Sequence, residues 1–189
     1  MDNHMAITPE EAASARADAD LLHSAEEIAA LLDTMAAEIT TVLGDKNPLV
    51  LCVMTGGVIF TGHLLTRLDF PLEQDYLHAT RYRGKTSGSK TITWLHKPDT
   101  PLQGRHVLLL DDILDEGYTL REIAHWCHEQ DAASVKVAVL ADKQHDRRVE
   151  GIKRDFSAIE LVDRYVFGFG MDYKEYWRNA NGIYAIKGL

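Results

Sequence analysis

The sequence predicts an α/β fold in which helices flank a parallel β-sheet. A continuously apolar run at residues 49–54 and two largely apolar runs at 106–110 and 134–140 are typical of strands buried on both faces. Amphipathic helical patterns follow the first two runs, and strand–helix units in series favour parallel strands. Ligands bind beyond the carboxyl ends of such strands, so the residues that follow each run are the first candidates for a functional site.

Two helices are expected before the sheet begins. Thr8, Pro9 and Glu11 have the pattern of an N-cap, a first-turn proline and an acidic residue that caps in return. Ser24 and Glu27 form a second capping box, which opens a helix whose apolar residues recur with a period of about 3.6 residues. A glycine and a proline at positions 44 and 48 end this core-facing helix.

The remaining segments complete a single expected domain. Residues 74–96 are polar and β-forming, and their Gly/Ser-rich centre predicts a mobile loop between two strands. A fourth strand is expected at residues 165–169, before an irregular aromatic segment. We expect residues 1–47 to supply the N-terminal helices and residues 48–145 the core. Residues 146–189 should form a small hood with the N-terminal segment.

Composition and charge restrict the class of protein. No apolar run reaches the roughly 18 residues that a membrane span needs. The formal net charge is −9 and there is no basic block, which argues against a nucleic-acid partner. Cys52 and Cys127 lie in apolar runs, so we expect buried free thiols and a cytoplasmic protein without a membrane partner.

The most informative stretch is the string VLLLDDILDEGYTL at residues 107–120. An apolar strand leads into Asp111 and Asp112, and a glycine loop then brings Thr119 to the start of a helix. The N–H groups of a helix N-terminus can bind a monophosphate, and the carboxylates can hold ribose hydroxyls or a hard cation. Two aspartates alone would more simply end a strand and cap a turn. The whole string describes a site for a phosphorylated pentose.

This string resembles the signature by which type I phosphoribosyltransferases bind phosphoribosyl pyrophosphate (PRPP). Three further features resemble the hypoxanthine-guanine branch of that family: LCVMTGG at residues 51–57, Lys143 after the third strand, and YVFGFGMDYKEYWR at residues 165–178. The resemblance runs from about Leu49 to Arg178 with order and spacing preserved. It implies a Mg²⁺-dependent enzyme of purine salvage that joins hypoxanthine or guanine to PRPP. The products would be IMP or GMP and pyrophosphate, and the assembly a homodimer or homotetramer.

Carried over by position, the resemblance assigns the purine end of the site. Asp115 would be the catalytic acid/base beside purine N7, and Lys143 would donate to the oxygen at C6. Tyr165 would stack on the base, and the Val166 backbone would read its Watson–Crick edge. Asp172 would lie near the 2-position and approach a second Mg²⁺.

The resemblance assigns the PRPP end in the same way. Asp111 and Asp112 would contact the ribose hydroxyls and Mg²⁺, and Tyr82 would close over the site as a lid. The 5′-phosphate would be held by Asp115, Glu116, Gly117, Tyr118 and Thr119. The pyrophosphate would be held by Thr55, Gly56, Gly57 and Arg178.

Two residues depart from the pattern of the family. Thr55 stands where better-known members often carry a basic residue, and Glu116 stands where a small hydroxylated residue is common. An acid beside a phosphate is unfavourable unless its side chain points away. The family also carries a non-proline cis peptide, here between Met54 and Thr55, which a sequence does not reveal.

Other interpretations stay open on the sequence. A xanthine preference or a different base would keep the fold and change the substrate. A regulator that senses PRPP would keep the fold without the reaction, although the intact Asp115 and the acidic charge count against it. Asp142, beside Lys143, is expected to form only a surface pair.

Overall fold

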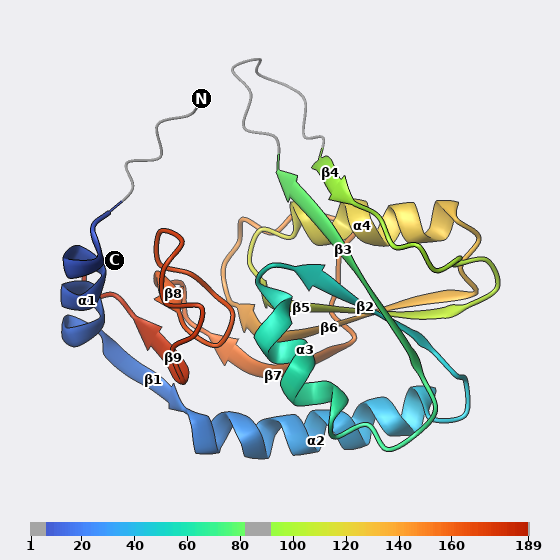
Figure 1. Ribbon diagram of the computed structural model, residues 1–189, viewed down its shortest axis with the longest axis horizontal. Helices are drawn as coiled ribbons and strands as arrows, with labels where there is room; N and C mark the ends of the chain where they lie inside the picture. The colour runs from blue at the N-terminus through green and yellow to red at the C-terminus, as the bar shows by residue number, and fades with distance from the viewer. Residues whose placement is uncertain (1–6, 82–91, 189) are drawn as a thin grey trace.

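The computed structural model describes residues 7–81 and 92–188, which form two β-sheets and the helices around them (Figure 1). The larger sheet has six strands in the order β4-β3-β2-β5-β6-β7, and only the β3–β4 pair is antiparallel. Its strands are β2 (Leu49–Met54), β3 (Glu73–Arg81), β4 (Ile92–His96), β5 (His106–Leu114), β6 (Ser134–Lys143) and β7 (Phe156–Leu161). The predicted helix-flanked parallel sheet is confirmed, with β4 as an antiparallel edge strand.

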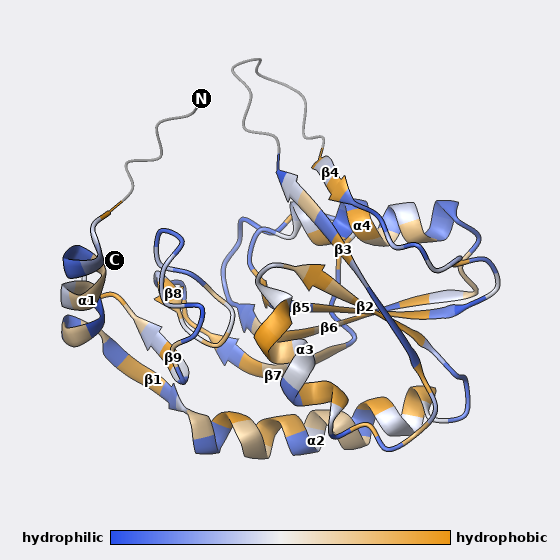
Figure 2. Ribbon diagram, in the orientation of Figure 1, coloured by the Kyte–Doolittle hydropathy of each residue, from blue (hydrophilic) through white to orange (hydrophobic). Residues whose placement is uncertain are grey.

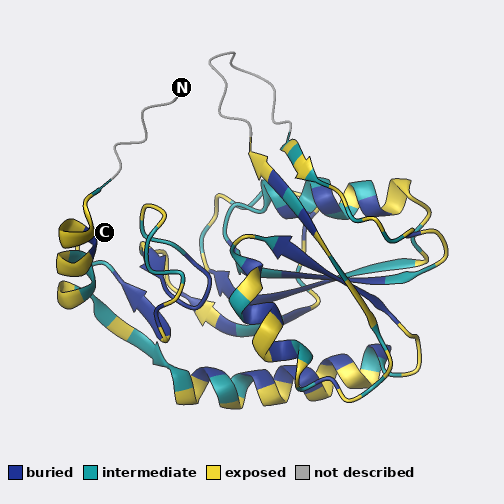
Figure 3. Ribbon diagram, viewed as in Figure 1, coloured by how far each residue is buried: buried dark blue, intermediate teal, exposed yellow. Residues whose placement is uncertain are grey.

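The central strands are buried on both faces because alternate residues enter two different cores (Figure 3). Val50 and Leu108 pack with helices α2 (Ala25–Leu43) and α3 (Gly57–Leu65). Leu49 and Leu109 pack on the other face with α4 (Tyr118–Glu129). Successive side chains of a strand point to opposite faces, so helices on both faces require the unbroken apolar runs that colour the sheet interior in Figure 2.

Both predicted helix starts are confirmed. In α1 (Pro9–Asp18), the Thr8 hydroxyl accepts from the Glu11 N–H at 3.2 Å, and the Glu11 carboxylate accepts from the Thr8 N–H at 2.7 Å. Ser24 and Glu27 make the same pair of bonds at the start of α2. Helix α2 is long and core-facing, and it runs along both sheets (Figure 1).

The second sheet joins the two terminal segments of the chain. It has three antiparallel strands, in the order β1 (Asp20–Ser24), β9 (Gly182–Ala185) and β8 (Val166–Phe167). This sheet is the expected hood, but β1 and β9 were not predicted because each is short and depends on pairing with a segment about 160 residues away.

Three strand predictions need correction. Strand β5 continues through Asp111 and Asp112 to Leu114, and β6 continues to Lys143, so these polar residues lie in the strands and not beyond them. The parallel strand that follows β6 is β7, whose mixed burial pattern hid it. Residues 165–169 contribute only β8 to the small sheet, because Gly168 and Gly170 turn the chain with φ of 100° and 112°.

The cysteines behave as predicted. Cys52 and Cys127 are both buried free thiols, and burial raises the pKa of Cys127 to about 12. Across residues 7–81 and 92–188, no helix has both the length and the apolar character needed to cross a membrane.

Candidate active site

A cavity of about 950 Å³ lies at the carboxyl ends of β2, β5 and β6. The connections from β2 and from β5 leave in opposite directions along the sheet, as expected at the switch point of a doubly wound sheet. The cavity gathers most of the predicted site residues: Thr55, Gly56, Asp111, Asp112, Asp115, Glu116, Gly117, Tyr118, Thr119, Lys143, Tyr165, Val166, Asp172 and Arg178. Gly57 starts α3 and does not line the cavity. Tyr82 lies outside the described residues.

The loop after β5 delivers the start of α4 to this cavity. Gly117 is the N-cap and has a φ of 83°, which favours glycine. A Cβ at Gly117 would lie 2.7 Å from Cγ2 of Ile152, so close packing also demands the glycine. Tyr118 and Thr119 therefore line the cavity at a helix N-terminus, where N–H groups and the helix dipole favour an anion.

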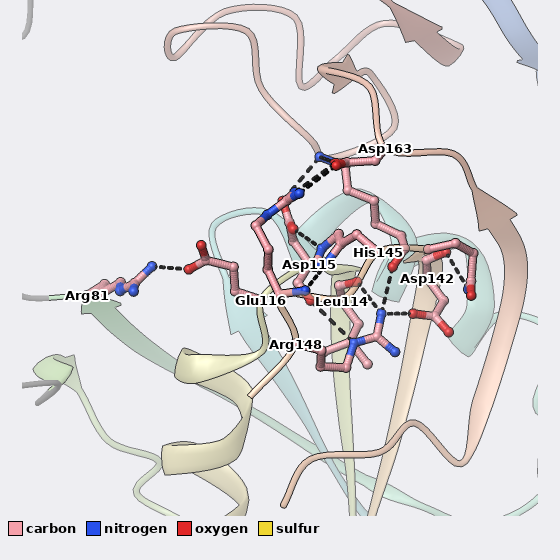
Figure 4. Close-up of polar contacts among 11 residues, drawn as sticks. Arg81, Leu114, Asp115, Glu116, Asp142, His145, Arg148 and Asp163 are labelled. Atoms are coloured by element: carbon pink, nitrogen blue, oxygen red, sulfur yellow. Dashed lines mark hydrogen bonds and ion pairs between the residues drawn. The ribbon is translucent and has the colours of Figure 1, made fainter. Parts of the chain in front are cut away.

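The acidic side chain of Glu116 is turned toward β3 (Figure 4). Nη1 of Arg81 lies 2.5 Å from Oε2 of Glu116, and the Arg81 guanidinium lies 4.3 Å from the ring centroid of Tyr118. This ion pair satisfies the condition under which an acid is tolerable in a phosphate loop. Arg81 was not predicted, because it lies 35 residues from Glu116 in the sequence.

Asp111 and Asp112 form a close acidic pair at the centre of the cavity. Asp112 is 8% exposed, and its N–H donates to Oδ1 of Asp111 at 3.0 Å. Burial raises the pKa of both carboxyls, and repulsion from Asp112 raises that of Asp111 further. The pair therefore favours a cation or hydroxyl donors in front of it.

Two glycines allow the loop after β2, the predicted pyrophosphate loop, to approach the acidic pair. A Cβ at Gly56 would lie 2.2 Å from Oδ2 of Asp112, and a Cβ at Gly170 would lie 2.2 Å from the Gly56 carbonyl oxygen. The Met54–Thr55 peptide is cis. The loop that follows β8 therefore packs directly on the loop that follows β2.

Arg178 joins the acidic end of the cavity to the loop after β8. Its Nη2 lies 2.7 Å from Oδ1 of Asp172, and its Nη1 donates to the Gly170 carbonyl at 2.9 Å. Asp172 is anchored again by the Glu175 N–H, which donates to its Oδ2 at 2.8 Å. This network fixes the predicted pyrophosphate-binding arginine beside the predicted metal-proximal aspartate.

Lys143 and Asp115 meet at the opposite end of the cavity. Nζ of Lys143 lies 3.2 Å from Oδ2 of Asp115 and 3.7 Å from Oδ1 of Asp163. Tyr165, 40% exposed, lines the same cavity, and its ring lies edge-on to that of Tyr173 with the ring centroids 5.6 Å apart. A cationic donor, a carboxylate and an exposed aromatic ring are the groups that could hold a planar, hydrogen-bonding base.

The prediction for Asp142 was wrong. Its side chain is 3% exposed and accepts from the guanidinium groups of Arg148 and Arg154, not from Lys143. A buried carboxylate needs such partners, and the arginines were not recognised because they follow in an irregular loop.

Several further residues line the cavity without a sequence motif to mark them. Arg147 makes a bidentate ion pair with Asp163, with Nη1 2.6 Å from Oδ2 and Nη2 2.8 Å from Oδ1. These hydrogen bonds lower the pKa of Asp163 to about 2. His78, Leu95 and Glu175 complete the wall. These positions are set by tertiary packing, and no spacing in the sequence connects them to the motif.

Comparisons with known proteins agree with this geometry. The model of the phosphoribosyl transferase domain family matches residues 18–175. The hypoxanthine-guanine-xanthine phosphoribosyltransferase of Tritrichomonas foetus is 36% identical over 168 residues, which cover 88% of this chain and 91% of the relative. The hypoxanthine-guanine phosphoribosyltransferase of Streptococcus pneumoniae (strain ATCC BAA-255 / R6) is 34% identical over 167 residues, with 88% and 92% covered.

Solved structures of the same class superpose closely. A hypoxanthine-guanine-xanthine phosphoribosyltransferase matches with a TM-score of 0.82 and 32% identity, covering 90% of this chain and 99% of that one. A hypoxanthine phosphoribosyltransferase from Staphylococcus aureus matches with a TM-score of 0.85 and 25% identity, covering 91% and 94%. Together with the cavity at the switch point of the sheet, these matches show that the chain belongs to the phosphoribosyltransferase family.

Proposed function

We propose that this protein transfers the 5-phosphoribosyl group of PRPP to N9 of hypoxanthine or guanine. The products are IMP or GMP and pyrophosphate, so the reaction belongs to purine salvage. One observation carries the proposal: a single cavity holds a helix N-terminus, a buried acidic pair and the Lys143–Asp115 pair side by side. These groups match the phosphate, the ribose with its leaving group, and the base.

The 5′-phosphate binds at the start of α4. Residues 115–119 line this part of the cavity, and most contacts come from backbone N–H groups, with the Thr119 hydroxyl adding a donor. Arg81 keeps the charge of Glu116 away from the phosphate. A protein with a net charge of −9 can thus bind a polyanion through local groups.

Asp111 and Asp112 face the ribose hydroxyls and a divalent cation, which we propose is Mg²⁺. Among residues 7–81 and 92–188 no cluster of three or more His, Cys, Asp or Glu side chains is arranged around a metal position. Mg²⁺ is usually bound by one or two carboxylates together with water and substrate phosphates, so the buried pair fits an ion that arrives with PRPP. When bound, Mg²⁺ neutralises the leaving pyrophosphate.

The pyrophosphate itself is held by backbone and arginine donors. The loop of Thr55, Gly56 and Gly57 follows β2 beside the acidic pair, and Arg178 lies on the far side next to Asp172. Thr55 provides no positive charge, so Arg178 supplies more of the side-chain attraction in this chain. Asp172 would help to hold a second Mg²⁺.

At the base, Lys143 donates to the oxygen at purine C6, which selects 6-oxopurines over adenine. Tyr165 stacks on the ring, a contact worth about 1–3 kcal/mol for nucleic-acid bases. The Val166 backbone reads the Watson–Crick edge. Since Nζ of Lys143 lies 3.2 Å from Asp115 without a base present, base binding exchanges this ion pair for the contact with the C6 oxygen and frees Oδ2 of Asp115 to face N7.

In the reaction, the bond between C1 of the ribose and the pyrophosphate oxygen breaks as N9 bonds to C1. The purine proton that must leave is taken through N7 by Asp115, which acts as general base. Tyr82, which lies outside the described residues, is proposed to close over the site and exclude water. Exclusion matters because water would otherwise capture the electron-poor C1.

The proposal also includes a cytoplasmic location for the protein and its assembly into a homo-oligomer. Two buried, unpaired cysteines support a cytoplasmic location. The homodimer or homotetramer is tested by size-exclusion chromatography with light scattering.

The experiment incubates the purified protein with PRPP, MgCl₂ and one of hypoxanthine, guanine, xanthine or adenine, and follows nucleotide formation. We expect IMP and GMP, no product with EDTA, and a fall in kcat of about 10²–10⁴-fold for Asp115→Asn. Turnover of xanthine but of no other base would show that xanthine is the substrate, in place of hypoxanthine and guanine. Binding of PRPP without turnover of any base would contradict the proposal and favour a regulator.

A further inference from the structure

The segment that follows Lys143 folds back over Asp115 and contacts it through a buried histidine (Figure 4). We propose that His145 is a positioning residue, which donates a hydrogen bond to one oxygen of Asp115 and leaves the other oxygen for the purine. This inference rests on the proposed role of Asp115 as general base.

The contact is short and shielded from water. Nε2 of His145 lies 2.6 Å from Oδ1 of Asp115, and the His145 side chain is only 3% exposed. The Asp115 side chain is 43% exposed on its other side, where it lines the cavity. The histidine therefore holds the Asp115 carboxylate on the side away from the cavity. The other side of the carboxylate faces the cavity, where the purine would bind.

The hydrogen-bond network assigns the tautomer of the ring. The backbone N–H of Arg147 donates to Nδ1 of His145 at 3.1 Å, so Nδ1 is an acceptor without a proton. The proton of a neutral imidazole must then lie on Nε2, the atom that faces Asp115. His145 is thus set as a donor and does not take a proton from the carboxylate, which distinguishes a positioning role from a proton relay.

The two oxygens of Asp115 have different partners. Oδ1 is held by His145 at 2.6 Å, whereas Oδ2 meets Lys143 at the longer distance of 3.2 Å. Lys143 has an alternative partner in Asp163 at 3.7 Å and can turn to the base. Of these two contacts, the His145 bond is the one that remains when Lys143 turns to the purine, so it holds the carboxylate in line with N7.

The histidine sits in a fixed turn. The guanidinium of Arg148 donates to three carbonyl oxygens, at 3.3 Å to Leu114, 3.4 Å to Asp115 and 2.8 Å to Lys143. It is anchored in turn by the buried carboxylate of Asp142. These bonds tie the ends of β5 and β6 together, so the distance between His145 and Asp115 is set by the scaffold and not by a mobile loop.

The test compares His145→Leu, which removes the donor, with His145→Gln, whose side-chain amide can restore it. His106→Leu is the matched control, because Nδ1 of His106 is hydrogen-bonded at 2.7 Å to Ser134 at the opposite end of β5. With PRPP and hypoxanthine, we expect His145→Leu to lower kcat by roughly 10–100-fold, as for a misplaced catalytic group, with both KM values within about twofold. His145→Gln should recover most of the loss, and His106→Leu should retain the wild-type kcat.

Three results would overturn the proposal: a wild-type kcat in His145→Leu, a loss that appears in both KM values and not in kcat, or a glutamine variant as slow as the leucine variant. Thermal melting of each variant shows whether a loss reflects unfolding.

The ¹⁵N spectrum of the His145 ring, assigned by its absence in His145→Gln, gives a test without turnover. It should show a protonated Nε2 and a bare Nδ1, and the reverse tautomer contradicts the inference. If the wild-type protein forms no nucleotide but its His145 ring shows the expected tautomer, the proposed function is refuted and the hydrogen bond from His145 to Asp115 is not.

Discussion

At the scale of single residues, the site is built from side chains whose charges are balanced by neighbours far away in the sequence. Glu116 illustrates this. Its carboxylate lies in the loop before α4, where we propose that the 5′-phosphate binds, and an acid is tolerated there because it pairs with Arg81 at the end of β3. The pair is partly exposed, so its contribution to folding stability is small, and its effect should fall on ligand binding.

The first prediction concerns this pair. Arg81→Met leaves the charge of Glu116 beside the 5′-phosphate, so the KM for PRPP should rise by about 3–10-fold, which corresponds to roughly 0.7–1.4 kcal/mol. Adding Glu116→Gln should restore much of the affinity, because the repulsive charge is gone. Initial-rate kinetics at varied PRPP check both variants. If the double variant binds PRPP as weakly as Arg81→Met, Arg81 acts as a direct phosphate ligand and not through Glu116.

At the scale of the elements, loops at the carboxyl ends of three parallel strands bring the functional groups together. The strands are rigid because both faces are buried, and the loops take their shape from glycines at close contacts, such as Gly117 over Ile152. Helix α2 supports this arrangement from below one face of the sheet, through residues such as Leu32 and Met35. Its stability therefore affects the fold more than the site.

The second prediction concerns the capping boxes. Ser24→Ala removes the hydroxyl that accepts from the Glu27 N–H, which should lower the free energy of unfolding by about 1 kcal/mol and the Tm by about 2–4 °C. The kcat should not change, because α2 does not line the cavity.

Thr8→Ala makes the same change in α1, where Ala12 is the one buried residue. Since α1 adds little to the core, its Tm shift should be smaller than that of Ser24→Ala. Differential scanning calorimetry measures both. Equal shifts would show that α1 is as tightly coupled to the core as α2.

At the scale of the whole molecule, the two sheets share one of the hydrophobic cores, the one on the α2 side of the large sheet. Ile28 and Ile39 of α2 belong to the same cluster as Leu140 of the large sheet and Ile183 of the small one. Phe169, in the loop between β8 and β9, joins this cluster as well. The hood that carries Tyr165 and Asp172 is therefore packed on the core and not attached by a linker.

The third prediction follows from this shared core. Urea unfolding should be a single transition, with the hood and the large sheet lost together. Trp177 packs against Phe167 and Tyr184 in the hood. Trp94 of β4 lies against Trp126 of α4, in the core on the other face of the large sheet. Variants that keep either Trp177 alone or the other two should report the same midpoint, as should far-UV circular dichroism. A lower midpoint for Trp177 would show that the hood unfolds separately.

The sequence by itself determined the features that depend on local patterns. The apolar runs predicted the buried strands, and the capping boxes located α1 and α2. The string at residues 107–120 predicted an acidic pair and a glycine loop before a helix, and it led to the proposed phosphate site. These predictions succeed because burial on both faces and helix capping leave short-range patterns. The family resemblance then assigned Asp115, Lys143 and Arg178 to one site, and the structure brings them to one cavity.

Only the tertiary structure decided which side chains support the site. No spacing in the sequence predicts the pairing of β1 with β9 or the ion pair of Arg81 with Glu116. The same holds for the burial of Asp142 against Arg148. Nothing in the sequence distinguishes His145 from an ordinary loop histidine, and only the fold places its Nε2 2.6 Å from Oδ1 of Asp115. The physical reason is that hydrogen bonds and ion pairs depend on distances of about 3 Å, which are set by how strands and loops pack and not by their order along the chain.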